Sequence, residues 1–146
     1  MKRATFVALG TGALIGSAAA IGIGTSDAAS PASLSRTQYQ DALARAVAGR
    51  GNALARCESV DAAHREICRT EAGAEATIAV ADIEERYRQD ASSARDAQRA
   101  RIDARYQVAR ARCQALAGFQ KDTCLISAHA ARGRALLQAH APYEIR

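Results

Sequence analysis

The sequence predicts an all-α fold of two tandem helical hairpins, about four helices in all, each stapled by a disulfide. Alanine, the strongest helix former, supplies 37 of the 146 residues. No segment after residue 28 alternates polar and apolar residues for long enough to build a sheet. Four cysteines fall into two pairs with the same internal spacing. These three observations favour a helical architecture with a thin core, cross-linked by disulfides.

The predicted core is small. Residues 29–146 hold only 18 Leu, Ile, Val and Phe in 118 positions, close to the composition of disordered chains. The length suits a single domain, and a large enzyme core with a deep pocket is not expected. No apolar run after residue 28 approaches the length of a membrane-spanning helix.

Residues 1–28 have the pattern of a secretory signal peptide. Lys2 and Arg3 precede an uncharged stretch over residues 4–26, and Ser26-Asp27-Ala28 suits signal peptidase. A retained membrane anchor is the alternative, because the apolar stretch is long. Both interpretations predict export. A cleaved signal peptide would leave the protein in the periplasm or outside the cell, and a retained anchor would hold it in the inner membrane, facing the periplasm. Residues 29–35 would form a short linker.

The cysteines indicate an internal repeat. Cys57 and Cys68 are separated by ten residues, and so are Cys113 and Cys124, displaced by 56 positions. The residues around them match without a gap: Ala53-x-Ala55-Arg56 with Ala109-x-Ala111-Arg112, and Arg65-Glu66 with Lys121-Asp122. We therefore expect two helical-hairpin repeats, over 36–88 and 94–141, and a tail over 142–146.

Local signals place the helices of the first repeat. Ser35 and Gln38 have the spacing of a capping box, and the first helix should end near Glu58, with a local break where Gly49 and Gly51 lie. Asp61 can cap a second helix that runs to about Tyr87. Acid-before-base pairs four residues apart are expected to stabilise exposed helix faces: Asp41 with Arg45, Asp61 with Arg65, Asp82 with Arg86 and Glu84 with Arg88.

The second repeat is placed in the same way. Ser92 and Ser93 can cap the third helix, Gly118 suits its C-terminal cap, Asp122 can begin the fourth, and Pro142 would end it. The third helix carries apolar residues at alternating spacings of four and three, which predict a narrow packing seam: Ile102, Tyr106, Ala109, Cys113 and Leu116.

Two disulfide schemes fit this spacing. Each pair can close its own hairpin, Cys57 with Cys68 and Cys113 with Cys124. If each spacer is instead helical, both cysteines share one face about 16 Å apart and the bonds run between the repeats. Gly118 and its polar successors favour a turn, and so favour local pairing. Exported proteins use even numbers of cysteines mainly in disulfides.

The paired motifs resemble a family of exported, Ala-rich helical proteins of proteobacteria with duplicated Cys-x10-Cys motifs, some of them labelled TolA-like cell-envelope proteins. The resemblance covers residues 39–139 and is most specific at Cys113-Gln-Ala-Leu-Ala-Gly118 and Lys121-Asp122-Thr-Cys124. The first repeat departs from it with Ala62 where the second has Gly118. The resemblance implies a helical fold and export, and no activity.

No catalytic motif stands out. The chain has no Gly-x-Ser-x-Gly, no phosphate-binding glycine loop and no His-Glu-x2-His, so no enzyme and no cofactor is expected. His64 and His129 lie near the cysteines, but the close Cys-x2-Cys spacing of zinc sites and thiol oxidoreductases is missing. A redox-responsive or metal-binding protein that uses Cys and His is therefore an alternative, not the preferred interpretation.

Arginine is the remaining feature. Six arginines on the third helix form two stripes beside its seam: Arg95, Arg99, Arg101, Arg105, Arg110 and Arg112. We expect the aliphatic stems of these arginines to cover the edges of a thin core. The alternative is that the arginines bind an anionic partner, either lipid through peripheral membrane contact or an envelope polymer. Nucleic acid is not an expected partner, because aromatic residues are few. The preferred function is a non-catalytic structural or protein-interaction module of the cell envelope.

Overall fold

The computed structural model describes residues 33–140, which form four helices and no strands: α1 (Arg36–Cys57), α2 (Ala62–Arg88), α3 (Ala91–Gln114) and α4 (Gly118–His140). The predicted all-α fold is confirmed. The expected signal peptide, the first part of the linker and the tail lie outside the described residues. None of the helices in the described part of the chain is long and apolar enough to span a membrane.

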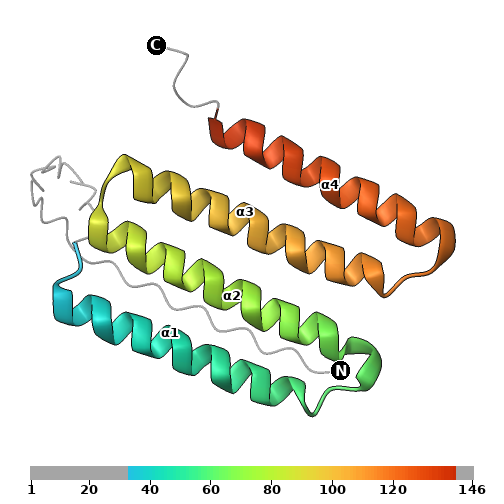
Figure 1. Cartoon of the computed structure of the whole chain (residues 1–146), viewed down its shortest axis with the longest axis horizontal. Helices are drawn as coiled ribbons and strands as arrows, with labels where there is room; N and C mark the ends of the chain where they lie inside the picture. Colours follow the sequence, from blue (N-terminus) through green and yellow to red (C-terminus); the bar gives the residue numbers. More distant parts are fainter. Residues whose placement is uncertain (1–32, 141–146) are drawn as a thin grey trace, which may run out of the picture.

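The four helices lie side by side in one antiparallel row (Figure 1). Among the described helices, contacts form only between neighbours in the chain: α1 with α2, α2 with α3, and α3 with α4. The connections are short, over 58–61, 89–90 and 115–117, so each helix must fold back against the one before it. The helices form an open layer and do not close into a four-helix bundle.

Small residues fill the contacts between the helices. Apart from Ile102, the buried apolar residues of the described chain are alanines and cysteines: Cys57, Ala72, Ala74, Ala97, Ala104, Ala111, Cys113 and Ala128. Alanine lets helix axes approach closely but buries little apolar area, so the core stays thin.

The predicted seam of α3 is too narrow. Ile102 and Cys113 are buried as expected, whereas Leu116 lies beyond the helix and is 41% exposed. The other buried positions of α3 are Ser93, Ala97, Ala104 and Ala111. Because α3 packs against α2 on one side and α4 on the other, it buries two stripes, and small residues make up most of them.

The helix ends of the first repeat agree with the sequence signals. Ser35 forms the capping box with Gln38, Asp61 accepts hydrogen bonds from the backbone N–H groups of Ala63 and His64, and α1 ends at Cys57 with Glu58 as its C-cap. The expected break at Gly49 and Gly51 is wrong: α1 runs through both glycines.

Three expectations about the second repeat are also wrong. Asp90, and neither Ser92 nor Ser93, caps α3; its carboxylate accepts from the Ser93 N–H, and its negative charge suits the helix N-terminus. Ala115, and not Gly118, is the C-cap of α3. α4 begins at Gly118 and not at Asp122, which lies inside its first turns. Gly118 has φ +51°, a left-handed conformation that glycine adopts without strain and that redirects the chain.

Candidate interaction surfaces

Both disulfides are local. Cys57 bonds to Cys68 and Cys113 to Cys124, with Cα atoms 5.6 and 5.4 Å apart, and the described residues contain no free cysteine. The first cysteine of each pair is 1% exposed. The two turns that they brace lie at the same end of the row (Figure 1). The scheme in which the bonds run between the repeats is therefore wrong, because each spacer contains a turn and not one continuous helix.

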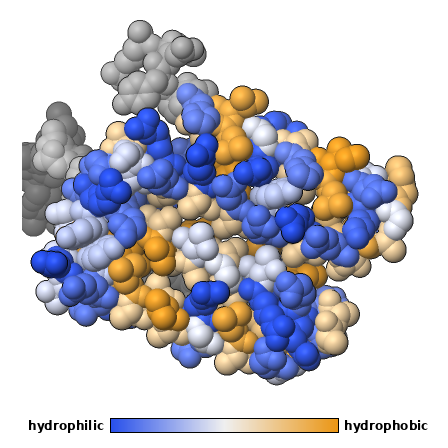
Figure 2. All heavy atoms as spheres, viewed as in Figure 1, coloured by the Kyte–Doolittle hydropathy of each residue, from blue (hydrophilic) through white to orange (hydrophobic). Residues whose placement is uncertain are grey.

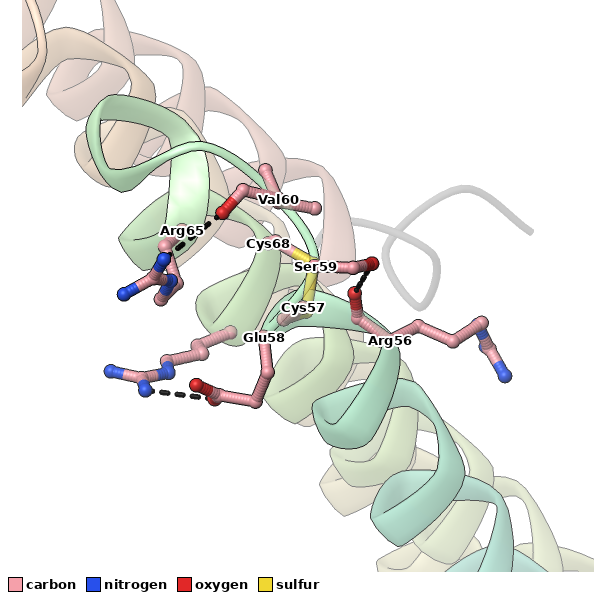
Figure 3. The surroundings of a disulfide bond; sticks show 8 residues. Arg56, Cys57, Glu58, Ser59, Val60, Arg65 and Cys68 are labelled. Carbon is pink, nitrogen blue, oxygen red and sulfur yellow. Dashed lines mark hydrogen bonds and ion pairs between the residues drawn. A yellow bond between two sulfur atoms is a disulfide. The ribbon is translucent and has the colours of Figure 1, made fainter.

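Polar contacts surround the first bridge (Figure 3). The Ser59 hydroxyl donates to the Arg56 carbonyl at 2.7 Å, and Arg65 donates to the Val60 carbonyl at 3.2 Å. Arg69 pairs with Glu58 at 2.8 Å, and this hydrogen bond lowers the pKa of the Glu58 carboxyl. These contacts satisfy carbonyls of the turn and explain how it forms without a glycine at position 62.

Aromatic and polar contacts fasten the other end of the α1–α2 hairpin. The rings of Tyr39 and Tyr87 stack with centroids 4.2 Å apart. The Tyr39 hydroxyl donates to Glu84, which raises the pKa of that phenol. Glu84 thus pairs across the hairpin with a tyrosine, and no ion pair joins it to Arg88 in the described structure.

Arginines of α3 join it to α2. Arg101 reaches Asp82 at 2.7 Å and Glu85 at 2.6 Å, and its hydrogen bonds to Glu85 and Asp82 raise its pKa. Arg112 reaches Glu71 at 2.6 Å. The four acid-base pairs expected within single helices are not among the ion pairs of the described residues. Asp82 pairs with the neighbouring helix instead of Arg86.

The six arginines do not form one free cationic surface. Arg101 and Arg112 are neutralised by α2, and Arg95 donates to the Ala91 carbonyl of its own helix. Arg99, Arg105 and Arg110 are exposed and form no ion pair with any described residue. Arg95, Arg101 and Arg105 line a groove of about 990 Å³ between α3 and α4.

The histidines lie apart from one another and serve local contacts. His64 pairs with the capping residue Asp61 at 2.9 Å. The His129 ring lies 3.1 Å from the Tyr106 hydroxyl. Arg132, on the same helix as His129, pairs with Asp103 at 2.7 Å. No group of three or more Cys, His, Asp or Glu is placed to hold a metal ion within residues 33–140. A redox-responsive or metal-binding function that uses Cys and His stays the alternative interpretation.

A groove over α2 is a feature that sequence reasoning missed. It has a volume of about 800 Å³, with α1 and α3 as its walls. Gly73, Ala76 and Thr77 line it along α2, Val47 stands on the α1 side with 70% of its surface exposed, and Ala104 faces them from α3. Figure 2 shows apolar residues at the surface in separate patches among charged ones. This is expected of an open row of helices, because it has no closed core in which to bury them.

Comparisons of the chain with models of protein families, with curated proteins and with solved structures find no match.

Proposed function

We propose that this protein is an exported, non-catalytic module of the cell envelope that binds another protein through the groove over α2. The observation that carries the proposal is the open row. Because α1 and α3 contact α2 but not each other, one face of α2 between them is left without a covering element in the described chain. A closed bundle would have filled that space with its fourth helix.

The groove has a lining that suits an α-helix. Small residues on α2 allow a second backbone to approach closely, since interaxial distances of about 8–10 Å depend on the side chains at the contact. Val47 on the α1 wall and Val80 on α2 offer exposed apolar contacts. Arg50 on the α1 wall and Asp103, which pairs with Arg132, on the α3 wall give the groove polar rims. An amphipathic partner helix would place its apolar face inward.

Export is supported by the residues and the chemistry of the cysteines. The pattern of residues 1–28 is that of a signal peptide, and two disulfides suit an oxidising compartment such as the periplasm. Duplication is supported by the helix starts, because α2 begins at residue 62 and α4 at 118, the same displacement of 56 as the cysteines. Both features favour a member of the TolA-like envelope family that the motifs resemble.

In-cell photo-crosslinking tests the groove. A photoreactive phenylalanine derivative at Thr77, inside the groove, should yield one discrete crosslinked protein in the envelope fraction. The same residue at Ala48, exposed on the far side of α1, is the matched control and should yield none. Equal crosslinking at both positions, or none at Thr77, would contradict the proposal.

Anion binding is a second candidate. Arg95 and Arg105, which form no ion pair with any described residue, line the groove between α3 and α4 beside the paired Arg101, and their charges would suit lipid head groups or an acidic polymer. Salt-sensitive binding to anionic vesicles, lost in Arg105→Gln but not in Arg45→Gln on α1, would support it. No binding at low salt would exclude it.

A further inference from the structure

The two edges of the helical row differ in character. The outer side of α1, opposite α2, carries only polar or small residues: Thr37, Asp41, Ala44, Ala48 and Asn52. The outer side of α4 carries three large apolar residues that are mostly exposed, Phe119 at 84%, Ile126 at 70% and Leu137 at 73%. The row thus has one edge suited to water and one suited to a further helix.

The large apolar residues exposed on α4, with the small residues between them, form a continuous stripe. Their positions fall on the alternating four-and-three spacing of a two-helix seam, together with three small residues: Phe119, Thr123, Ile126, Ala130, Gly133 and Leu137. None of the six is charged. At 100° per residue the stripe is centred opposite Ala128, the buried residue by which α4 packs on α3. We call these six residues the α4 stripe.

We propose that the α4 stripe pairs with the α4 stripe of a second copy of this chain, antiparallel, in a two-fold symmetric dimer. An axis level with Ala128 places Phe119 beside Leu137 of the second copy, Ile126 beside its Ala130, and Thr123 beside its Gly133. Ile126 then packs on a small residue, two small residues meet at Thr123 and Gly133 and let the backbones approach closely, and Phe119 packs on Leu137 at the two ends. The stripe is therefore complementary to itself.

Charges and area agree with this occupant. Arg134 and Asp122 flank the stripe on opposite sides, and in the antiparallel pair the two Arg134 side chains lie at levels about 18 Å apart, so no like charges meet. At roughly 150 Å² per large side chain, and with 84%, 70% and 73% of Phe119, Ile126 and Leu137 exposed, the six in the pair would bury about 700 Å². Their neighbours bring this towards the roughly 1,000 Å² of a specific interface, so a weak dimer is expected. The pairing uses α4 and leaves the groove over α2 free, so it is independent of the proposed function.

Sedimentation equilibrium of the full chain, as recovered from its host, tests the pairing. The wild type should associate to a dimer as its concentration rises. Ile126→Glu should weaken association at least about 30-fold, as expected for a residue at the centre of an interface. Val47→Glu, an equally exposed valine on α1, is the control and should dimerise like the wild type.

Circular dichroism of the same samples separates loss of dimer from loss of fold, because Ile126→Glu should keep its helicity. Mixing Ile126→Glu with Ile126→Lys should restore dimers, since the two charges then attract across the axis. A wild type that stays monomeric would overturn the proposal and leave another protein, or residues 1–32, as the occupant of the stripe. Dimers that Val47→Glu breaks and Ile126→Glu does not would overturn it equally.

Discussion

Removing the second disulfide should destabilise the row of helices by an amount set by the length of the loop that the disulfide closes. The double substitution Cys113→Ala with Cys124→Ala opens a loop of 11 residues. Restricting such a loop in the unfolded chain contributes about 2.8 kcal/mol at 25 °C by the chain-entropy estimate. For the 108 described residues, an unfolding entropy of roughly 0.23 kcal/mol/K converts this into a fall in Tm of about 12 °C.

The first disulfide gives a matched comparison. Cys57→Ala with Cys68→Ala opens a loop of the same length, so both double variants should lose about the same free energy. Together the two bridges supply about 5.6 kcal/mol, comparable to the whole stability of many small domains. The variant without cysteines should therefore be largely unfolded at 37 °C.

Thermal and urea unfolding followed by circular dichroism measure these changes, with and without reductant. Reduced wild type should match the variant without cysteines. A loss below about 1 kcal/mol for either double variant would refute the reasoning, because it would mean that the unfolded chain gains no freedom when the loop opens.

Three further predictions concern the contacts between helices, each measured as the free energy of unfolding in urea. Ala97→Leu should lower the free energy of unfolding by about 1–3 kcal/mol, because Ala97 is 1% exposed and has no room for a larger side chain. The control Ala48→Leu, at an exposed position of α1, should change it by less than about 0.5 kcal/mol. Equal effects would contradict close packing by alanine. Arg101→Ala should cost about 1 kcal/mol by breaking both of its links to α2, and Arg99→Ala, which breaks none in the described structure, should be neutral. Asp90→Asn should remove a pH dependence: hydrogen bonds from Ser92 and Ser93 lower the pKa of Asp90, so its contribution is present above about pH 4 and is lost as the pH falls further. An Asp90→Asn variant whose acid unfolding matches that of the wild type would show that this cap does not titrate as expected.

The helices and their pairing could be predicted because their signals are local. Ser35 and Asp61 cap helices through hydrogen bonds to residues two or three positions away, and Gly118 marks a turn inside the Cys113–Cys124 spacer. The cap of α3 was misplaced because three residues within four positions, Asp90, Ser92 and Ser93, could each accept the hydrogen bond. Asp90 prevails because it alone carries a charge that complements the helix dipole.

The open row could not be predicted, because nothing in a helix's own pattern says how many neighbours it will have. Alanine-rich faces fit one neighbour or two, and α3 has two. Arg101 could have paired within its helix or across to Asp82, and only the packing of α2 on α3 decides between them. The α4 stripe was different: the spacing of Phe119, Ile126 and Leu137 was readable in the sequence, but its exposure was not.

Peptide mapping under non-reducing conditions, on protein recovered from its native compartment, tests the central claim most directly. Local pairing predicts that trypsin leaves residues 57–65 linked to 66–69, and residues 113–121 linked to 122–132. Export predicts an intact mass that begins near Ala29 and is four hydrogens lighter than the reduced chain. Free thiols, or peptides linked between the two repeats, would contradict an exported row of two stapled hairpins.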